Sequence, residues 1–160
     1  QVVVSKQVKP SIQKIKDVTF QFIYYNEKHF FGYKKKWINS YDKVWCSDLE
    51  KTLVDCLYKP DYAGGIVEVA CGLYKAKDDI SYDKLLEYVT KFDTQVVIKR
   101  LGFILEMLEI ETDIIPKLQE LKTSSYTVLD TELPKKGKMH SRWSIRQNLD
   151  TETIKSAIYT

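Results

Sequence analysis

The chain has 160 residues, of which 44% are hydrophobic and 29% are charged. This length and composition fit one globular domain with a real core, and they exclude disordered and fibrous proteins. No apolar run approaches the roughly 20 residues that a membrane helix needs, and the first residues lack the pattern of a signal peptide. We therefore expect a single domain of a cytoplasmic protein that has no membrane partner. The chain starts at Gln1 rather than Met, which favours a fragment of a longer protein.

The three cysteines are Cys46, Cys56 and Cys71. Their number is odd and no pair has the C-x-x-C spacing, so the sequence predicts neither a disulfide framework nor a zinc site. We expect reduced, largely buried thiols and no cofactor.

The net charge of +3 is unevenly distributed. Residues 1–46 carry nine lysines and three acids, residues 47–132 carry ten basic and seventeen acidic residues, and residues 133–160 carry six basic and two acidic residues. If the basic ends converge in the fold, they would form one positive surface suited to a polyanion. The alternative is the ordinary solvated surface of a lysine-rich protein.

The first section of the chain favours β-structure. Val18–Tyr25 is dense in β-branched and aromatic residues, and its first positions alternate apolar with polar. Asn26–Lys28 is expected to turn the chain, so that Phe30–Tyr33 pairs back as a hairpin. Val44–Cys46 is expected to be another short strand.

The central section predicts helices at Ser47–Lys59, Ile66–Lys75, Tyr82–Phe92 and Gln95–Glu109, from apolar residues at helical spacing. Ser47 and Glu50 have the spacing of a capping box. Pro116 should lie in the first turn of a short fifth helix that reaches Leu121. Gly102 inside the fourth helix costs about 1 kcal/mol against Ala. Its presence indicates the close approach of a neighbouring element.

The last section returns to strands. Tyr126–Leu129 is one candidate, and Lys135–Lys138 is a basic turn. Arg142–Arg146 alternates, which should place Trp143 and Ile145 inward and both arginines outward. We therefore predict an α+β fold, in which a mixed sheet from the N- and C-terminal segments packs against four or five central helices.

The sequence contains no motif that predicts a catalytic centre. There is no G-x-S-x-G, no phosphate-binding glycine loop and no H-E-x-x-H. Gly64-Gly65 at a helix start could offer N–H groups to an anion, but a packing turn is the simpler interpretation. A nuclease needs clustered carboxylates, whereas Asp48, Glu50 and Asp55 fall on a predicted helix, where acids near the N-terminus stabilise the helix. We expect a regulator rather than an enzyme and keep a nuclease, intact or degenerate, as an alternative.

Three segments together resemble a known family. They are SDLEKTLVDCLYKPDYAGG (Ser47 to Gly65), KRLGFILEMLEI (Lys99 to Ile110) and RWSIRQN (Arg142 to Asn148). In this order and spacing they resemble the C-terminal domain of the AbiEi-family antitoxins of abortive-infection toxin–antitoxin systems. The family-motif positions are Glu50, Thr52, Leu53, Asp55, Gly64, Gly65, Arg100, Leu101 and Gly102.

The resemblance implies a function that composition does not. Such antitoxins join a winged-helix DNA-binding domain to this C-terminal domain, repress their own operon and neutralise a nucleotidyltransferase-type toxin without a stable complex. No helix-turn-helix pattern precedes Val18, so the DNA-reading domain is expected to be absent from this chain. The resemblance implies weak DNA binding without sequence preference, and no enzymatic activity.

The residues expected to contact nucleic acid are basic and lie in both end sections. Lys34, Lys35 and Lys36, next to Trp37, form the densest basic group, and Arg142 and Arg146 are expected on one strand face. Phosphate contacts of this kind give affinity without specificity. The alternatives are a solubilising lysine run with a charge-guarded strand edge, and a domain that serves only as a protein-interaction or dimerisation module.

Overall fold

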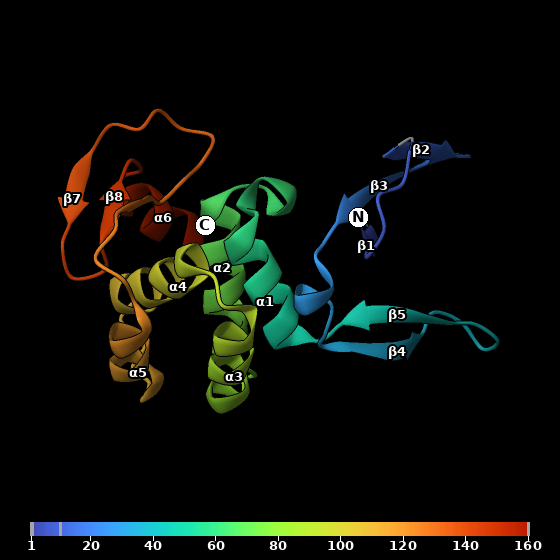
Figure 1. Ribbon diagram of the computed structural model, residues 1–160, viewed down its shortest axis with the longest axis horizontal. Helices are drawn as coiled ribbons and strands as arrows, with labels where there is room; N and C mark the ends of the chain where they lie inside the picture. Colours follow the sequence, from blue (N-terminus) through green and yellow to red (C-terminus); the bar gives the residue numbers. More distant parts are fainter. Residues whose placement is uncertain (1, 10, 160) are drawn as a thin grey trace. The chain divides into compact units, whose positions relative to one another are not determined.

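The computed structural model describes residues 2–9 and 11–159 and confirms the α+β class. The sequence predicts one domain, and contacts divide the structure into two compact units, residues 1–32 and residues 33–160. Helices and strands of both units are labelled in Figure 1. Within the described residues, no helix combines the length and the apolar character needed to cross a membrane.

The first unit is a small three-stranded sheet in the order β1-β3-β2. Its strands are β1 (Val2–Val4), β2 (Ile12–Ile15) and β3 (Val18–Tyr24), followed by the 3-10 helix η1 (Glu27–His29). β3 confirms the predicted strand, but the predicted hairpin of Phe30–Tyr33 against it is wrong. Both partners of β3 precede it in sequence, since β1 pairs with it in parallel and β2 pairs in antiparallel.

The second unit begins with a two-stranded antiparallel hairpin of β4 (Tyr33–Trp37) and β5 (Lys43–Ser47). An Asn39 side chain closes its turn, because Oδ1 accepts from the N–H groups of Tyr41 at 2.8 Å and Asp42 at 2.7 Å. Asn39 also donates from Nδ2 to the Asp42 carboxylate at 2.9 Å. β5 then leads directly into the first helix.

The helices follow the predicted apolar periodicity. They are α1 (Leu49–Tyr58), α2 (Ile66–Ala76), α3 (Tyr82–Phe92), α4 (Gln95–Met107) and α5 (Ile114–Leu121), with the 3-10 helix η2 (Pro60–Ala63) between α1 and α2. The fifth helix starts at the buried Ile114, so Pro116 lies in its first turn and the helix ends at Leu121, as predicted. α4 is the central helix, because every residue from Val97 to Leu105 is buried.

The C-terminal strands form a sheet of their own in the order β6-β8-β7. They are β6 (Thr127–Val128), β7 (Lys138–His140) and β8 (Ile145–Gln147), and the unpredicted helix α6 (Thr151–Ile158) follows and packs against α2. Trp143 and Ile145 are fully buried, as predicted. The prediction of one mixed sheet built from both ends is wrong, because the described N-terminal strands and the described C-terminal strands form separate sheets.

Candidate nucleic-acid interface

The lysine run Lys34–Lys36 lies on β4, and all three residues are exposed. Lys43 at the start of β5 adds a fourth lysine, while Asp42 is the single acid between Tyr33 and Ser47. A two-stranded ribbon with this excess of positive charge is complementary to a polyanion such as a nucleic-acid backbone. The hairpin is therefore the candidate interface.

The strand register sorts these lysines onto the two faces of the hairpin. Lys35 is paired with Trp45, and Trp37 is paired with Lys43, so these four side chains share one face. Lys34 is paired with Cys46 and Lys36 with Val44, which places them on the opposite face. The ammonium nitrogen of Lys35 lies 5.3 Å from the ring centre of Trp45, and that of Lys43 lies 4.1 Å from the ring centre of Trp37.

The base of the hairpin is fixed to the helices at the N-terminus of α1. The hydroxyl groups of Ser47 and Thr52 lie 2.7 Å apart, and Thr52 also donates to the backbone carbonyl of Asp48 at 2.7 Å. On the other strand, the ring centre of Tyr33 lies 5.5 Å from the buried ammonium of Lys51. Thr52, one of the family-motif residues, thus helps to hold the hairpin against α1.

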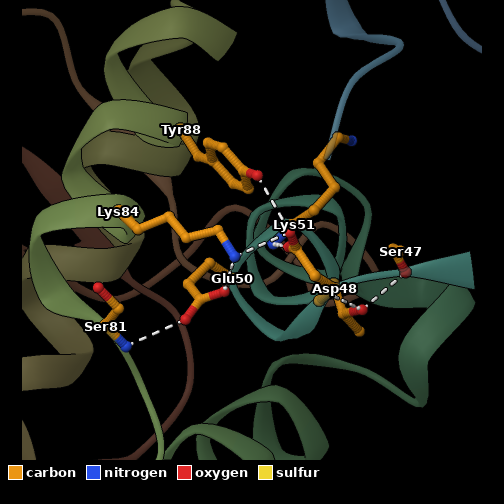
Figure 2. A network of polar contacts seen from close by, with 8 residues as sticks. Ser47, Asp48, Glu50, Lys51, Ser81, Lys84 and Tyr88 are labelled. Atoms are coloured by element: carbon orange, nitrogen blue, oxygen red, sulfur yellow. Dashed lines mark hydrogen bonds and ion pairs between the residues drawn. The ribbon is translucent and has the colours of Figure 1, made fainter. Parts of the chain in front are cut away.

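The predicted capping box does not form, because Asp48 rather than Ser47 caps α1. Its Oδ1 accepts from the Lys51 N–H at 3.0 Å, and its Oδ2 accepts from the Tyr88 hydroxyl at 3.0 Å. The Glu50 carboxylate accepts from the Ser81 N–H at 3.0 Å. Figure 2 shows Tyr88 and Lys84 of α3 pointing at these two acids.

Lys84 joins the two carboxylates, with its ammonium 2.9 Å from Asp48 and 2.9 Å from Glu50. Burial alone would raise the pKa of both acids, but the hydrogen bonds and the Lys84 charge outweigh it and hold each pKa below its ordinary value. Both acids are therefore ionised at neutral pH, and they tie α1 to α3.

Lys51 and Asp55 form an ion pair on the inner side of α1. Lys51 is fully buried, and its ammonium also lies 5.2 Å from the ring centre of Phe92. Burial lowers the pKa of Lys51, and the Asp55 carboxylate offsets part of that effect. The family-motif acid Asp55 thus balances a buried charge next to the hairpin.

The other family-motif residues also have structural roles. Leu53 and Leu101 lie in the core, and Gly102 faces the ring of Trp143. Gly64 and Gly65 have φ values of +87° and +92°. Both of their N–H groups donate to the Pro60 carbonyl, which supports the interpretation of a packing turn.

Arg100 of α4 is fully buried and binds backbone carbonyls from two other elements. Its guanidinium donates to the Leu57 carbonyl in the last turn of α1 at 2.7 Å and to the Val128 carbonyl of β6 at 3.4 Å. Burial lowers the pKa of Arg100 to about 10, so the side chain remains charged at neutral pH. Arg100 therefore joins α1 and β6 to the central helix.

Arg142 and Arg146 do not share a strand face, contrary to the sequence prediction. Arg142 lies in the turn before β8 and forms a bidentate ion pair with Glu106, with its Nη2 2.6 Å from Oε1 and its Nε 2.9 Å from Oε2. Arg146 lies on β8 and donates to the Lys135 carbonyl at 2.7 Å. Ser144, with a φ of +50°, belongs to the same turn, and the strand begins only at Ile145.

The two predicted basic groups do not converge. Within the second unit, Figure 1 shows the β4–β5 hairpin on one side of the helices and β7–β8 on the other. Lys34–Lys36 therefore form a surface separate from that of Arg142 and Arg146. Of these five residues, Arg142 alone has an acidic partner among the contacts of the described residues, whereas Arg146 donates to a backbone carbonyl.

Among residues 2–9 and 11–159, no group of three or more His, Cys, Asp and Glu side chains is arranged to hold a metal ion. Metal-dependent nucleases often carry a lysine two residues after an acid on the same strand. The triplet Glu120 to Lys122 has this spacing but lies at the end of α5 rather than on a strand. The three cysteines are free. Burial and Asp55 raise the pKa of Cys56 to about 11, so this thiol is protonated at neutral pH.

Sequence reasoning missed three residues of the interface as interacting groups: Trp37, Lys43 and Trp45. The available signal was the turn sequence Asn39-Ser40-Tyr41-Asp42 between two short runs that contain aromatic residues, Tyr33 and Trp37 before it and Trp45 after it. No family model, no curated protein and no solved structure matches the chain.

Proposed function

We propose that the chain is a regulatory domain that binds nucleic acid through the β4–β5 hairpin. The observation that carries the proposal is the exposed hairpin itself, with four lysines and one acid on a ribbon that is fixed to the helices at its base. Lysines on such a ribbon bind phosphates by releasing condensed counterions, and this gives affinity without base recognition.

We further propose, from the sequence resemblance, that the domain acts in an antitoxin of the AbiEi kind. In that role it supports the DNA binding of an autoregulatory repressor and the neutralisation of a nucleotidyltransferase-type toxin, without a stable complex with the toxin. A separate DNA-reading domain would supply sequence recognition, and the hairpin would add phosphate contacts beside it.

Duplex binding tests the first part of the proposal. The chain should bind a random-sequence duplex with a dissociation constant of about 10⁻⁴–10⁻⁶ M at physiological salt, and the affinity should fall steeply as salt rises. Replacing Lys34, Lys35 and Lys36 by Ala should weaken binding to every sequence alike and flatten the salt dependence. The matched control replaces Lys117, Lys135 and Lys136, which lie outside the hairpin, and should retain more affinity than the hairpin variant.

Growth rescue tests the second part. Co-expression of the chain with a nucleotidyltransferase-type toxin should restore growth, and no complex should survive purification. Failure of rescue by a soluble, folded chain would remove the antitoxin role and leave the nucleic-acid role standing. Tight, sequence-selective binding to DNA by the chain alone would contradict the proposal that a separate domain supplies sequence recognition.

A further inference from the structure

One face of the β4–β5 hairpin presents two tryptophans to solvent. Trp37 is 62% exposed and Trp45 is 66% exposed, although tryptophan is among the residues that gain most from burial. The register places them diagonally across the two strands, with Lys35 and Lys43 at the other two corners. We refer to these four residues as the Lys–Trp face.

Each tryptophan is accompanied by a lysine at short range, with ammonium-to-ring-centre distances of 4.1 Å at Trp37 and 5.3 Å at Trp45. A cross-strand cation–π pair on an exposed surface contributes less free energy than the burial of a large apolar side chain gains. The stability of the hairpin alone therefore does not explain why both tryptophan rings are exposed.

The opposite face of the same ribbon differs in composition. It carries Lys34 and Lys36 on β4, paired with Cys46 and Val44 on β5, and no aromatic ring. Charge is thus available on both faces, whereas flat π-surfaces are confined to one. A polyanion that needs only charge would fit either face, so the aromatic rings select a ligand with flat surfaces of its own.

In a duplex, the flat surfaces of the bases are covered by their stacked neighbours, and only base edges are open to side chains. In a single strand, the unpaired bases can stack on aromatic rings while lysines contact the adjacent phosphates. Diagonal positions on an antiparallel ribbon have Cα atoms about 7–8 Å apart, so the two rings can serve bases of the same strand.

We propose that the Lys–Trp face is a stacking surface for unpaired bases of single-stranded nucleic acid. This inference rests on the proposed nucleic-acid function and adds the class of strand that the hairpin prefers. Trp37 and Trp45 stack on bases, and Lys35 and Lys43 bind the neighbouring phosphates. The face reads no base edge, so binding tolerates any base sequence.

Titration of the full 160-residue chain with oligothymidylate of about 16 nucleotides, and with a duplex of equal length, tests the inference. Trp37→Ala and Trp45→Ala should each weaken oligothymidylate binding at least about fivefold, and leave duplex binding little changed. Phe at both positions keeps a stacking ring and should restore part of the affinity. Because both side chains are exposed, the thermal melts of these variants should match that of the parent.

Intrinsic fluorescence gives a second readout, since the chain has three tryptophans and Trp143 is fully buried. Oligothymidylate should quench the emission of Trp37 and Trp45, and the variant with Phe at both positions should show almost no quenching. The variant Lys35→Gln/Lys43→Gln should lose more single-strand binding than the variant Lys34→Gln/Lys36→Gln. The second variant is the control, because it has the same change of charge on the opposite face.

Three results would overturn the inference. If both tryptophan variants bind oligothymidylate like the parent while the lysine variants lose all binding, the stacking role fails and the phosphate-binding function stands. If the parent binds neither single strands nor duplexes at low salt, both proposals fail. If the chain binds vesicles of anionic phospholipid through the same two tryptophans but no oligonucleotide, the Lys–Trp face serves a membrane surface instead.

Discussion

The ring of Trp143 occupies the space that a side chain at Gly102 would need. A Cβ atom built on Gly102 would lie 2.1 Å from the Trp143 ring, far inside the van der Waals distance. Trp143 is fully buried there, and its indole N–H donates to the Glu106 carboxylate one helical turn further along α4, at 2.7 Å. The two contacts together dock the start of β8 on the central helix.

Gly102→Ala should therefore destabilise the protein, because the methyl group forces the Trp143 ring out of its site. We expect a loss of about 1–3 kcal/mol in the free energy of unfolding, despite the better helix propensity of Ala. Gly72→Ala in α2 is the matched control, since nothing lies within 4 Å of its Cβ position. Chemical denaturation should show the control unchanged or stabilised by up to about 1 kcal/mol. Equal effects of the two changes would argue against the close approach.

Leu101→Ala tests the core of the second unit. Leu101 is fully buried in α4 and Leu53 is 6% exposed in α1, so both changes should leave cavities costing about 2–5 kcal/mol. The Leu101 variant should be the less stable of the two, because α4 is surrounded by protein along most of its length. Thermal melts that do not move for either variant would show that these helical faces are not packed as described.

Arg100→Met removes a buried charge that holds two elements to α4. The Leu57 and Val128 carbonyls would lose their donor, and hydrogen bonds to a charged group are typically worth about 1.5–3 kcal/mol. We expect a loss of at least this size, with faster amide hydrogen exchange at the end of α1 and at β6. Arg100→Lys keeps the charge but not the planar donor geometry, so its stability should lie between that of the parent and the Met variant.

Acid should weaken the junction between α1 and α3. The pKa values of Asp48 and Glu50 are lowered in the folded protein, so both acids contribute stability above their unfolded values of about 3.9 and about 4.3. That contribution is lost as the pH falls through the folded pKa values. The double variant Asp48→Asn/Glu50→Gln should be less stable than the parent at pH 7, and its free energy of unfolding should fall less below about pH 4. If its stability falls with acid as much as that of the parent, Asp48 and Glu50 are not the source of the acid sensitivity.

The helices were predictable because helical periodicity is a local property. Gln95–Met107 and Tyr82–Phe92 could be located from the spacing of their own apolar residues, and Gly102 indicated a close neighbour. The identity of that neighbour, Trp143, depends on a contact between distant segments. Helix α6 was missed, and its apolar stripe has Ile154 as its one buried residue among those described.

The candidate interface was predictable only in part. Lys34–Lys36 stood out by charge, but the lysine run also concealed a strand whose partner begins at Lys43. The Lys–Trp face exists only after β4 and β5 pair, because the register decides which side chains share a face. The predicted common face of Arg142 and Arg146 was wrong because Arg142 lies in a turn that includes Ser144, and strand alternation begins only at Ile145.

Binding of nucleic acid to the β4–β5 hairpin can be mapped by the chemical shifts of backbone amide and indole N–H groups. The three tryptophans act as reporters, because Trp37 and Trp45 lie on the hairpin and Trp143 lies in the core. On addition of an oligonucleotide, residues 33–47 and the indole N–H signals of Trp37 and Trp45 should shift, while that of Trp143 should stay in place. Shifts centred on Lys135–Gln147 instead, or none along the hairpin, would contradict binding at the hairpin.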